Sequence, residues 1–451
     1  MLFPIMPKNL KKIFNASPKN PTFQQSNYPN MNLSQKDNLY NWHPYTQHQT
    51  TGLLPAIVKG QGVYLWDENG KEYIDAISSW WVNPFGHSNT IIAEAIYKQL
   101  TTLEHVLFGG FTNKPAVELA EKLLSILPSN QKKLFYSDNG STAVEIALKA
   151  ALQYFYNKGE KRTKIIAFEN GFHGDTFGAM AASGITFFTE AFHGSLLEVV
   201  RIPIPTAENN SLNLLNNLLK SNEFAAFIFE PLVQGAAGML MYEPKELDKL
   251  ISLCKKNNVF TIADEIMTGF GKTGKTFACD HLHEQPDMIC LSKALTGGTI
   301  PMAVTSFSQE IFDGFLSNDV NKALFHGHTF TGNPTGCAAA LAAIELLFKE
   351  EMHLNIKRVA EQQLYFAKRL ENYPNVQNIR TLGIILAFEI KRESTESYYG
   401  DFRNKLYAFF IENGIILRPV GNTIYILPPY VSTDEQLQII YKTVEKALQI
   451  V

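Results

Sequence analysis

An acidic and a basic side chain stand at the ends of two predicted buried strands. Asp264 closes the run VFTIAD, and Lys293 follows DMICLS directly. Functional residues of parallel sheets gather at the carboxyl ends of the strands, so this pair indicates a site. An amine there could act as a nucleophile or a proton-transfer base, and a carboxylate could hold a proton on a ring nitrogen. Taken alone, each has a structural explanation, as a turn cap for Asp264 and a surface loop for Lys293.

A possible phosphate-binding site lies at the N-terminus of a predicted helix. The stretch SDNGSTAVE places Gly140 and Ser141 there, and Thr142 with Glu145 fits a capping box. The free N–H groups of a first helical turn and the helix dipole favour a phosphate group. An ordinary helix cap produces the same pattern.

An aromatic residue follows another predicted strand. In ENGFHGDTFGAM, Phe172 and His173 lie in a glycine-flanked turn, where Phe172 could lie flat on a ring or pack in the core. A phosphate seat, a stacking aromatic residue, an acid for a ring nitrogen and a lysine that bonds to an aldehyde form the set that holds pyridoxal 5′-phosphate. Asp264 would keep the ring nitrogen protonated. Lys293 would bind the cofactor and then transfer protons.

Residues 269–276, GFGKTGKT, match the phosphate-loop pattern G-x-x-x-x-G-K-[ST] letter by letter. A working loop follows a strand directly and opens a helix. Here EIMT separates the strand from Gly269, and FACDHLHEQPDM after Thr276 lacks helical periodicity. The sequence therefore favours a mobile surface loop carrying Lys272 and Lys275 over a nucleotide site.

Strand and helix patterns alternate between these residues. The runs that read as strands are KKLFYSD, TKIIAFE, FAAFIFEP, VFTIADE and DMICLS. The last four are nearly continuous apolar runs, as in parallel strands buried on both faces. Helical patterns such as STAVEIALKAALQYFYNK and PKELDKLISLCKKNN separate several of them. This alternation predicts an α/β domain with a mostly parallel central sheet.

Changes in composition and in the predicted secondary structure along the chain indicate its domain boundaries. The first segment is rich in Asn, Gln, Ser, Pro and Lys and is expected to be a disordered tail, with Met31 as an alternative start. From about Asn333, long helical patterns lead into short strands, which indicates a smaller α+β domain. The predicted boundaries are a tail over 1–38, an arm and part of the small domain over 39–75, a large cofactor domain over 76–330 and a C-terminal small domain over 331–451.

The composition of the 451 residues argues against several classes of protein. With 45% hydrophobic residues, 18% charged residues and a net charge of −3, nothing favours nucleic acid or an anionic membrane as a partner. No apolar run is long enough to predict a membrane span. The cysteines form no C-x-x-C and are expected to be buried thiols in a reducing cytoplasm, without a metal or disulfides; they are Cys254, Cys279, Cys290 and Cys337.

Several blocks of the sequence resemble the class III aminotransferases of fold type I. They are ADEIMTGFGKTGK, LSKALTGG, NGSTAVEIALKAALQYF, GFHGDTFGAM and EPLVQGAAGM. The blocks WHPYTQ, SSWW, HVLFGGFT, HGHTFTGNP and LRPVGNTIYILPPY are similar to the branch that makes 7,8-diaminononanoate in biotin synthesis. The resemblance runs from about Leu39 to the C-terminus. It implies a homodimer with shared active sites and pyridoxal 5′-phosphate, which transfers an amino group from S-adenosylmethionine to 8-amino-7-oxononanoate.

The resemblance also implies roles for individual residues. Ile266 would pack on the ring face opposite Phe172, Thr329 would reach the phosphate across the dimer interface, and Arg418 would hold the substrate carboxylate. The implied cofactor-binding residues are Gly140, Ser141, Phe172, His173, Glu230, Asp264, Ile266, Lys293, His328 and Thr329. The implied substrate-binding residues are Tyr45, Trp80, Phe172, Lys272, Lys293, Gly327, Arg418 and Tyr425.

Two departures from the family pattern bear on specificity. Phe172 stands where relatives often carry tyrosine, and Lys272 takes the place of an arginine and lacks its planar fork. S-adenosylmethionine remains the amino donor that the resemblance implies, with lysine as the alternative. The rival functions are another class III transaminase acting on ornithine or an ω-amino acid, a phosphate-loop nucleotide hydrolase, and a protein that kept the fold without the activity.

Overall fold

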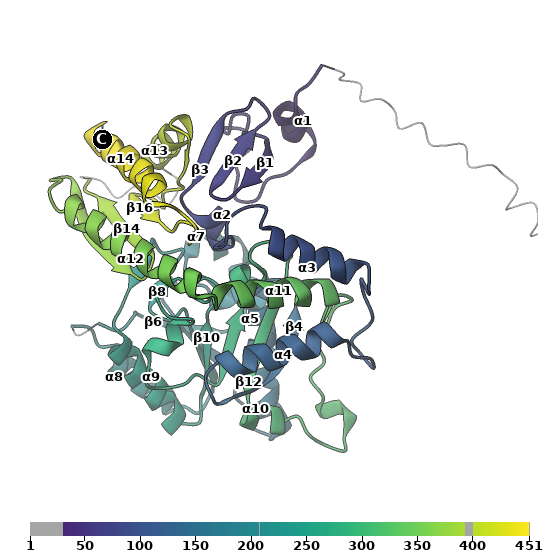
Figure 1. The fold of residues 1–451 in the computed structure, drawn as a ribbon. Helices are drawn as coiled ribbons and strands as arrows, with labels where there is room; N and C mark the ends of the chain where they lie inside the picture. The colour runs from purple at the N-terminus through teal and green to yellow at the C-terminus, as the bar shows by residue number, and fades with distance from the viewer. Residues whose placement is uncertain (1–29, 207, 393–399, 451) are drawn as a thin grey trace, which may run out of the picture. The chain divides into compact units, whose positions relative to one another are not determined.

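The computed structural model describes residues 30–206, 208–392 and 400–450 (Figure 1). It comprises two units. The first contains the chain up to Val58 together with Trp66–Lys71, and the second contains Lys59–Leu65 and Glu72–Val451. The domain boundaries expected after residues 75 and 330 are not tested by this division and stay predictions.

The first unit contains one helix, α1 (Leu33–Tyr40), among its described residues. Asn32 and Gln35 form a capping box at its start, and the carboxylate of Glu68 accepts hydrogen bonds from the first two backbone N–H groups. Residues 1–29 of the predicted tail lie outside the described residues. The prediction of disorder as far as residue 38 is wrong at its end, because these caps satisfy the N–H groups of a helix that begins at Leu33.

A seven-stranded sheet forms the centre of the second unit, in the order β4-β12-β11-β10-β7-β5-β6 (Figure 1). All neighbouring strands run parallel except β12, which is antiparallel to β11 and β4. The strands are β4 (Gln131–Ser137), β5 (Lys164–Phe168), β6 (Val199–Ile202), β7 (Phe224–Phe229), β10 (Phe260–Asp264), β11 (Met288–Leu291) and β12 (Ala303–Ser308). The predicted α/β class with a mostly parallel sheet is confirmed.

Both faces of this sheet are buried, as the continuous apolar runs predicted. In β7, Ala226 and Ile228 belong to the core on one face, and Phe227 and Phe229 belong to the core on the other. Helix α5 (Gly140–Asn157) covers the first face. The core on the second face includes residues of α4 (Lys114–Ile126), α8 (Ser211–Leu219), α9 (Pro244–Lys256) and α11 (Pro334–Leu347).

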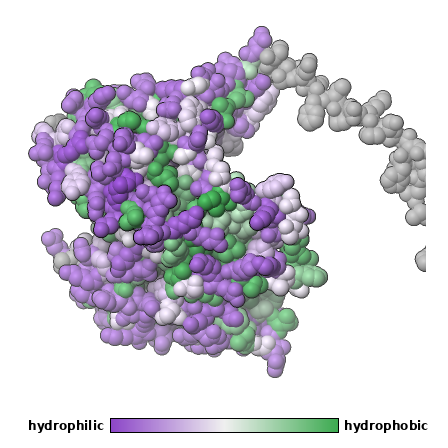
Figure 2. Space-filling model, in the orientation of Figure 1, coloured by the Kyte–Doolittle hydropathy of each residue, from purple (hydrophilic) through white to green (hydrophobic). Residues whose placement is uncertain are grey.

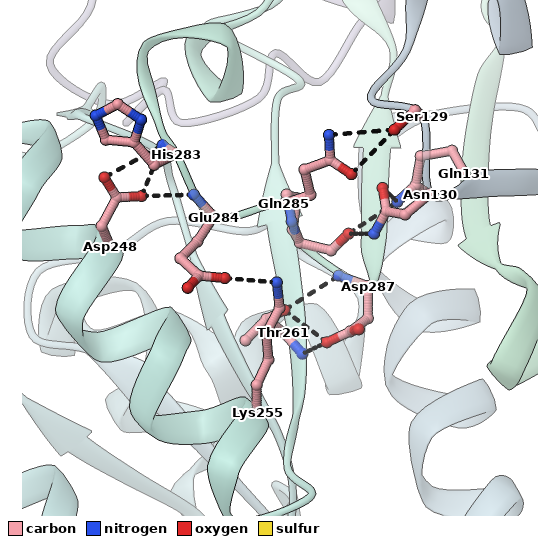
Figure 3. Close-up of polar contacts among 11 residues, drawn as sticks. Ser129, Asn130, Gln131, Asp248, Lys255, Thr261, His283, Glu284, Gln285 and Asp287 are labelled. Carbon is pink, nitrogen blue, oxygen red and sulfur yellow. Dashed lines mark hydrogen bonds and ion pairs between the residues drawn. The ribbon is translucent and has the colours of Figure 1, made fainter.

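Polar residues tie down the edge of the sheet where β10 and β11 begin (Figure 3). Asp287 accepts hydrogen bonds from the backbone N–H and the hydroxyl of Thr261. The carboxylate of Asp248 on α9 accepts from the backbone of His283 and Glu284, and Lys255 lies 2.7 Å from Glu284. The charged side chains at this edge therefore bind other parts of the fold. The candidate site residues lie at the opposite edge of the sheet, where β10 and β11 end.

The C-terminal part of the second unit holds a smaller antiparallel sheet, in the order β13-β14-β16. Buried side chains of α12, such as Ile356, Val359 and Phe366, follow one helical face, and the outward surface over α12 and α14 is mainly hydrophilic (Figure 2). The elements are α12 (Glu350–Leu370), β13 (Val376–Leu382), β14 (Ile385–Ile390), α13 (Asp401–Glu412), β15 (Ile415–Ile416), β16 (Thr423–Ile426) and α14 (Asp434–Ile450).

A four-stranded sheet, β1-β2-β3-β15, brings early and late segments together. Within the second unit, β3 pairs parallel with β15, so that Asp75 lies opposite Ile416. The remaining strands are β1 (Ile57–Gln61), β2 (Tyr64–Asp67), β3 (Glu72–Asp75), β8 (Val233–Gln234) and β9 (Leu240–Met241). The remaining helices are α2 (Ser78–Trp81), α3 (Thr90–Leu100), α6 (Phe177–Ala182), α7 (Thr186–Thr189) and α10 (Gln309–Asp313), with short 3-10 helices η2 (Glu190–Ser195), η3 (Ala278–His281), η4 (Lys293–Thr296) and η5 (Val320–Lys322).

Candidate active site

The residues that sequence patterns single out follow the carboxyl ends of parallel strands. Phe172 and His173 come after β5, Glu230 follows β7, Asp264 ends β10, and Lys293 comes two residues after β11. Because β5, β7, β10 and β11 are neighbours in that part of the sheet, their ends share one edge. The topology therefore places these side chains at the edge where α/β proteins bind ligands.

Asp264 is held by a buried histidine. The Oδ2 of Asp264 lies 2.7 Å from the Nδ1 of His173, and its Oδ1 accepts a hydrogen bond of 3.1 Å from the backbone N–H of Ile266. Both side chains are almost fully buried, and the other ring nitrogen of His173 has no partner among the described residues. A carboxylate accepts up to about four hydrogen bonds, so Asp264 is oriented and still has acceptor capacity for a ligand.

Glu230 fixes the turn that carries Phe172. Its Oε1 accepts from the backbone N–H of Phe172 at 2.9 Å, and its Oε2 accepts from that of Gly235 at 2.9 Å. Burial raises the pKa of Glu230 to about 7, an effect that His173 opposes and Asp264 strengthens. The buried carboxyl group thereby holds Phe172 in place next to the His173–Asp264 pair.

The start of α5 is compact and has little room for larger residues. A Cβ on Gly140 would lie 2.9 Å from side-chain atoms of Ile266, so a larger residue there would force Ile266 to shift. The hydroxyl of Ser141 lies 2.7 Å from that of Thr176 and accepts a hydrogen bond from the Thr176 backbone N–H. Gly174, with φ of 129°, passes so close to Ser141 that a side chain would clash. These contacts bring the helix start against the turn that follows Phe172.

The capping box at this helix is not the one predicted. Asn139 is the N-cap, and it exchanges hydrogen bonds with Thr142 instead of Thr142 pairing with Glu145. Glu145 lies on the second turn, where its Oε1 accepts from the backbone N–H groups of Gly178 and Ala179. The helix begins three residues earlier than a Thr142 cap requires, which leaves Glu145 free to cap α6.

Lys293 lies in a left-handed backbone conformation, with φ of 48°, at the start of η4. Its Nζ is 4.6 Å from the ring centroid of Trp81, a cation–π contact. Burial lowers the pKa of the Lys293 amine, and the charges of Asp264 and Glu230 act against this shift. A lysine with a lowered pKa is a better nucleophile and base near neutral pH.

Lys272 is buried, and the prediction of a mobile surface loop is wrong for it. Its side chain is 0% exposed, and its ammonium donates to the carbonyl oxygen of Gly269 at 3.1 Å. The β13–β14 turn packs on the loop: Ile384 donates to the Lys272 carbonyl, and a Cβ on Gly383 would clash with the loop backbone. Lys275 is exposed, as predicted. A substrate contact by Lys272 stays a prediction that its burial does not favour.

Burial and the charge of Lys293 lower the pKa of Lys272 to about 7, an effect that Glu265 opposes. The loop that carries Lys272 is followed by η3, a 3-10 helix of four residues, and not by an α-helix. The N-terminus that would hold a nucleotide phosphate is therefore missing here, in agreement with the sequence argument.

Three of the predicted substrate residues, Trp80, Arg418 and Tyr425, form a second group. The Cζ of Arg418 lies 4.6 Å from the ring centroid of Trp80, and the buried Tyr425 meets the edge of Trp81 at 6.0 Å between ring centroids. Trp81 joins this group to Lys293, a role that the sequence reasoning missed. The motif SSWW was a signal for it, but the motif does not tell which ring faces the lysine.

The other predicted residues lie in two further segments, the loop after α1 and residues 327–329. Tyr45 belongs to the first unit, with φ of 51° in the loop after α1. Gly327 and Thr329 are exposed. His328 accepts a hydrogen bond at its Nδ1 from the backbone of Phe330. Their roles in a site completed by a second chain stay predictions.

Among the described residues, no group of three or more His, Cys, Asp and Glu side chains could hold a metal ion, and no helix could span a membrane. The four cysteines are buried free thiols, as expected.

The profile of the class-III aminotransferases matches residues 45–448, and the chain belongs to this family. Among its relatives is the adenosylmethionine-8-amino-7-oxononanoate aminotransferase of Synechococcus elongatus, 41% identical over 90% of this chain and 98% of the relative. The crystal structure of the enzyme of that name from Methanocaldococcus jannaschii is 37% identical, with a TM-score of 0.88 over 93% of this chain and 99% of that one. An amine transaminase from an uncultivated Pseudomonas species, solved in its PLP-bound form, is 28% identical with a TM-score of 0.85 over 91% of this chain and 98% of that one.

Proposed function

We propose that this chain is a pyridoxal 5′-phosphate-dependent aminotransferase of biotin synthesis. It converts 8-amino-7-oxononanoate to 7,8-diaminononanoate with S-adenosylmethionine as amino donor. The observation that carries the proposal is the pair of neighbouring strands β10 and β11, which lead into a histidine-bound Asp264 and a half-buried Lys293. Relatives that match over nearly their whole length carry the name of that activity and supply the substrate.

The residues of the site fit the cofactor. Asp264 has acceptor capacity left for a ring nitrogen, and the first turn of α5 offers the N–H groups of Gly140 and Ser141 to a phosphate. Phe172 is held by Glu230, and Ile266 lies against Gly140, so both can meet a flat ring. When bound, pyridoxal 5′-phosphate supplies an electron sink that lets a carbon-bound proton of an amine leave.

The side chains then divide the work. Asp264 holds the proton on the ring nitrogen, and His173 keeps the carboxylate oriented. With the cofactor bound, the Nζ of Lys293 would take a proton from the donor carbon and pass it to the cofactor in the first half of the reaction, and would move a proton the opposite way, to the acceptor carbon, in the second half. Arg418, stacked on Trp80, offers two parallel N–H groups to a substrate carboxylate.

Two further statements belong to the proposal. The enzyme is a cytoplasmic homodimer in which Thr329 and His328 of each chain complete the other chain's site. This is supported by the exposure of Thr329 and Gly327 in a single chain and by the implied role of this loop. The large domain of residues 76–330 and the small domain formed by the segments around it are the two parts of that fold.

The test is to mix the purified protein with 8-amino-7-oxononanoate and, in separate reactions, S-adenosylmethionine, lysine and ornithine, and to measure 7,8-diaminononanoate. The expected result is diamine formation, fastest with S-adenosylmethionine. Amino transfer to other ketones or aldehydes, with none to 8-amino-7-oxononanoate, would assign the chain to another branch of the class III transaminases.

A further inference from the structure

The motif SSWW forms an unusual backbone turn. Ser78, Ser79, Trp80 and Trp81 all lie in the left-handed region, with φ of 49°, 45°, 67° and 72°. Left-handed helical backbone is unfavourable for residues that have a Cβ, and it normally occurs at single positions. A run of this length persists only where the surroundings hold it.

A buried carboxylate holds the turn. The Oδ1 of Asp75 accepts from the backbone N–H of Ile77 at 3.1 Å, and its Oδ2 accepts from the hydroxyl of Ser79 at 2.8 Å. Asp75 is 0% exposed and ends β3, whose pairing with β15 fixes it in the scaffold. The hydroxyl of Ser78 donates to the carbonyl of Leu427 at 2.9 Å and holds the other side of the turn.

A histidine completes this anchor. The Nε2 of His87 lies 3.0 Å from the Oδ2 of Asp75, and its Nδ1 lies 2.9 Å from the side-chain nitrogen of Asn83. With Asn83 donating to Nδ1, the ring carries its proton on Nε2 and donates it to Asp75. The same carboxylate oxygen therefore binds both the histidine and the hydroxyl of Ser79.

The turn places two adjacent indole rings against two cations. Trp81 faces the Nζ of Lys293, and Trp80 faces the guanidinium of Arg418, each at 4.6 Å from the ring centroid. The left-handed turn thus presents the two adjacent side chains of one dipeptide to both groups. Trp81 also fills the space beside Gly235, where a Cβ would lie 3.3 Å from the indole ring.

We propose that Asp75 and His87 are positioning residues for amino transfer: they hold the Ser78–Trp81 turn so that Trp81 covers Lys293 while Trp80 supports Arg418. The proposal rests on the proposed function, because that function assigns proton transfer to Lys293 and carboxylate binding to Arg418. In this proposal Asp75 and His87 act through the two tryptophans, because their described contacts are with the turn and its neighbours.

The mildest test compares two serines. Ser79→Ala removes the hydroxyl bound to Asp75. The control is Ser88→Ala. Ser88 also has a left-handed backbone, with φ of 54°, and its hydroxyl donates to the Gly60 carbonyl at 2.7 Å. Turnover number, Michaelis constant for the amino acceptor and thermal unfolding are compared between the two holoenzymes. For Ser79→Ala we expect a loss of roughly 10- to 150-fold in kcat/KM, the range for one hydrogen bond to a charged group, and for Ser88→Ala a change within about twofold.

A double-mutant cycle tests whether Asp75 acts through the rings. Asp75→Asn should lower the wild-type kcat/KM by more than Ser79→Ala does, and it should have little further effect in a Trp80→Phe/Trp81→Phe background. Near-UV circular dichroism of the apoprotein provides a readout that does not depend on activity. The indole signal should change in Asp75→Asn and Ser79→Ala and stay as in wild type in Ser88→Ala.

The outcomes separate the two proposals. Equal kcat/KM and equal dichroism in the two serine variants would overturn the positioning role, as would full additivity of Asp75→Asn with the tryptophan variants. If Asp75→Asn does not fold, Ser79→Ala against Ser88→Ala decides the question. If the wild type forms no diamine, the proposed function fails, and the dichroism still reports whether Asp75 holds the turn.

Discussion

The imidazole of His173 and the carboxylate of Asp264 lie 2.7 Å apart, both buried, although the two residues are more than ninety positions apart in the chain. The histidine orients the carboxylate and leaves it with an acceptor face for a ligand. This relationship turns a carboxylate at a strand end into a group that can hold a proton on a ring nitrogen. It also makes Asp264 the most informative residue to change.

Asp264→Asn should keep the cofactor bound and slow both half-reactions by roughly 10²–10⁴-fold, because an amide does not hold the ring proton as a carboxylate does. Stopped-flow measurement of each half-reaction checks this. Asp287→Asn is the matched control, since Asp287 accepts from Thr261 at the opposite edge of the sheet and should affect stability alone (Figure 3). Half-reaction rates that barely change in Asp264→Asn would mean that the carboxylate is structural.

Lys293→Ala should abolish turnover, because the group that binds the cofactor covalently and moves protons is lost. The protein should still fold, since the side chain is half-buried and its described ring contact is with Trp81 alone. Mass spectrometry after borohydride reduction should find the cofactor on Lys293 in the wild type and on no residue in the variant. Lys275→Ala, at an exposed lysine that donates to the Asp280 carbonyl, should keep both label and turnover. A label on another lysine with normal turnover would refute the assignment.

The buried Lys272 should give the protein a pH-dependent stability above neutrality. Its pKa is about 7 in the folded protein, against 10.5 for an ordinary lysine. Between these values the unfolded chain binds a proton that the folded protein has released, so stability rises with pH, by at most about 1.4 kcal/mol per pH unit.

Urea unfolding of the wild type and Lys272→Met from about pH 7 to about pH 10, the window between the two pKa values, measures this contribution. The variant has no amine to titrate, and the wild type should gain stability relative to it as the pH rises. Lys275→Met is the control, because Lys275 is exposed, and its difference from wild type should stay constant. A constant difference for Lys272→Met as well would show that the buried amine keeps its proton throughout.

Phe172→Tyr should sharpen the choice of amino donor. Phe172 has no hydroxyl to offer a substrate, and a site that lacks a hydrogen-bonding group discriminates less. A restored hydroxyl should favour S-adenosylmethionine over lysine by roughly 0.5–1.5 kcal/mol, the net value of one hydrogen bond. A competition assay with both donors measures the ratio for wild type and variant. Phe188→Tyr, at the ring that meets Phe172 edge-on, serves as a control for an added hydroxyl nearby. An unchanged ratio would mean that this hydroxyl does not set the donor.

The sequence by itself determined five of the seven strands of the central sheet, several helices and the edge at which chemistry takes place, whereas β6 and β12 were not predicted. Runs such as FAAFIF and VFTIAD are apolar at nearly every position, as strands buried on both faces must be, and a residue that closes such a run has a known place in a parallel sheet. Asp264 and Lys293 were found in this way because the signal is local. The cap of α5 was misplaced, because Asn139 and Thr142 are both good capping residues and the local pattern allows either.

Only the tertiary structure decided what surrounds these residues. The burial of Lys272 depends on a hairpin turn at Gly383, more than a hundred residues later in the chain. The local sequence GFGKTGKT does not predict this contact. The left-handed turn of SSWW depends on Asp75 and on the carbonyl of Leu427, and the choice of Trp81 over Trp80 as the partner of Lys293 follows from that turn. Local sequence sets where a side chain leaves its strand or helix, whereas contacts between distant segments set its burial, its charge and its partner.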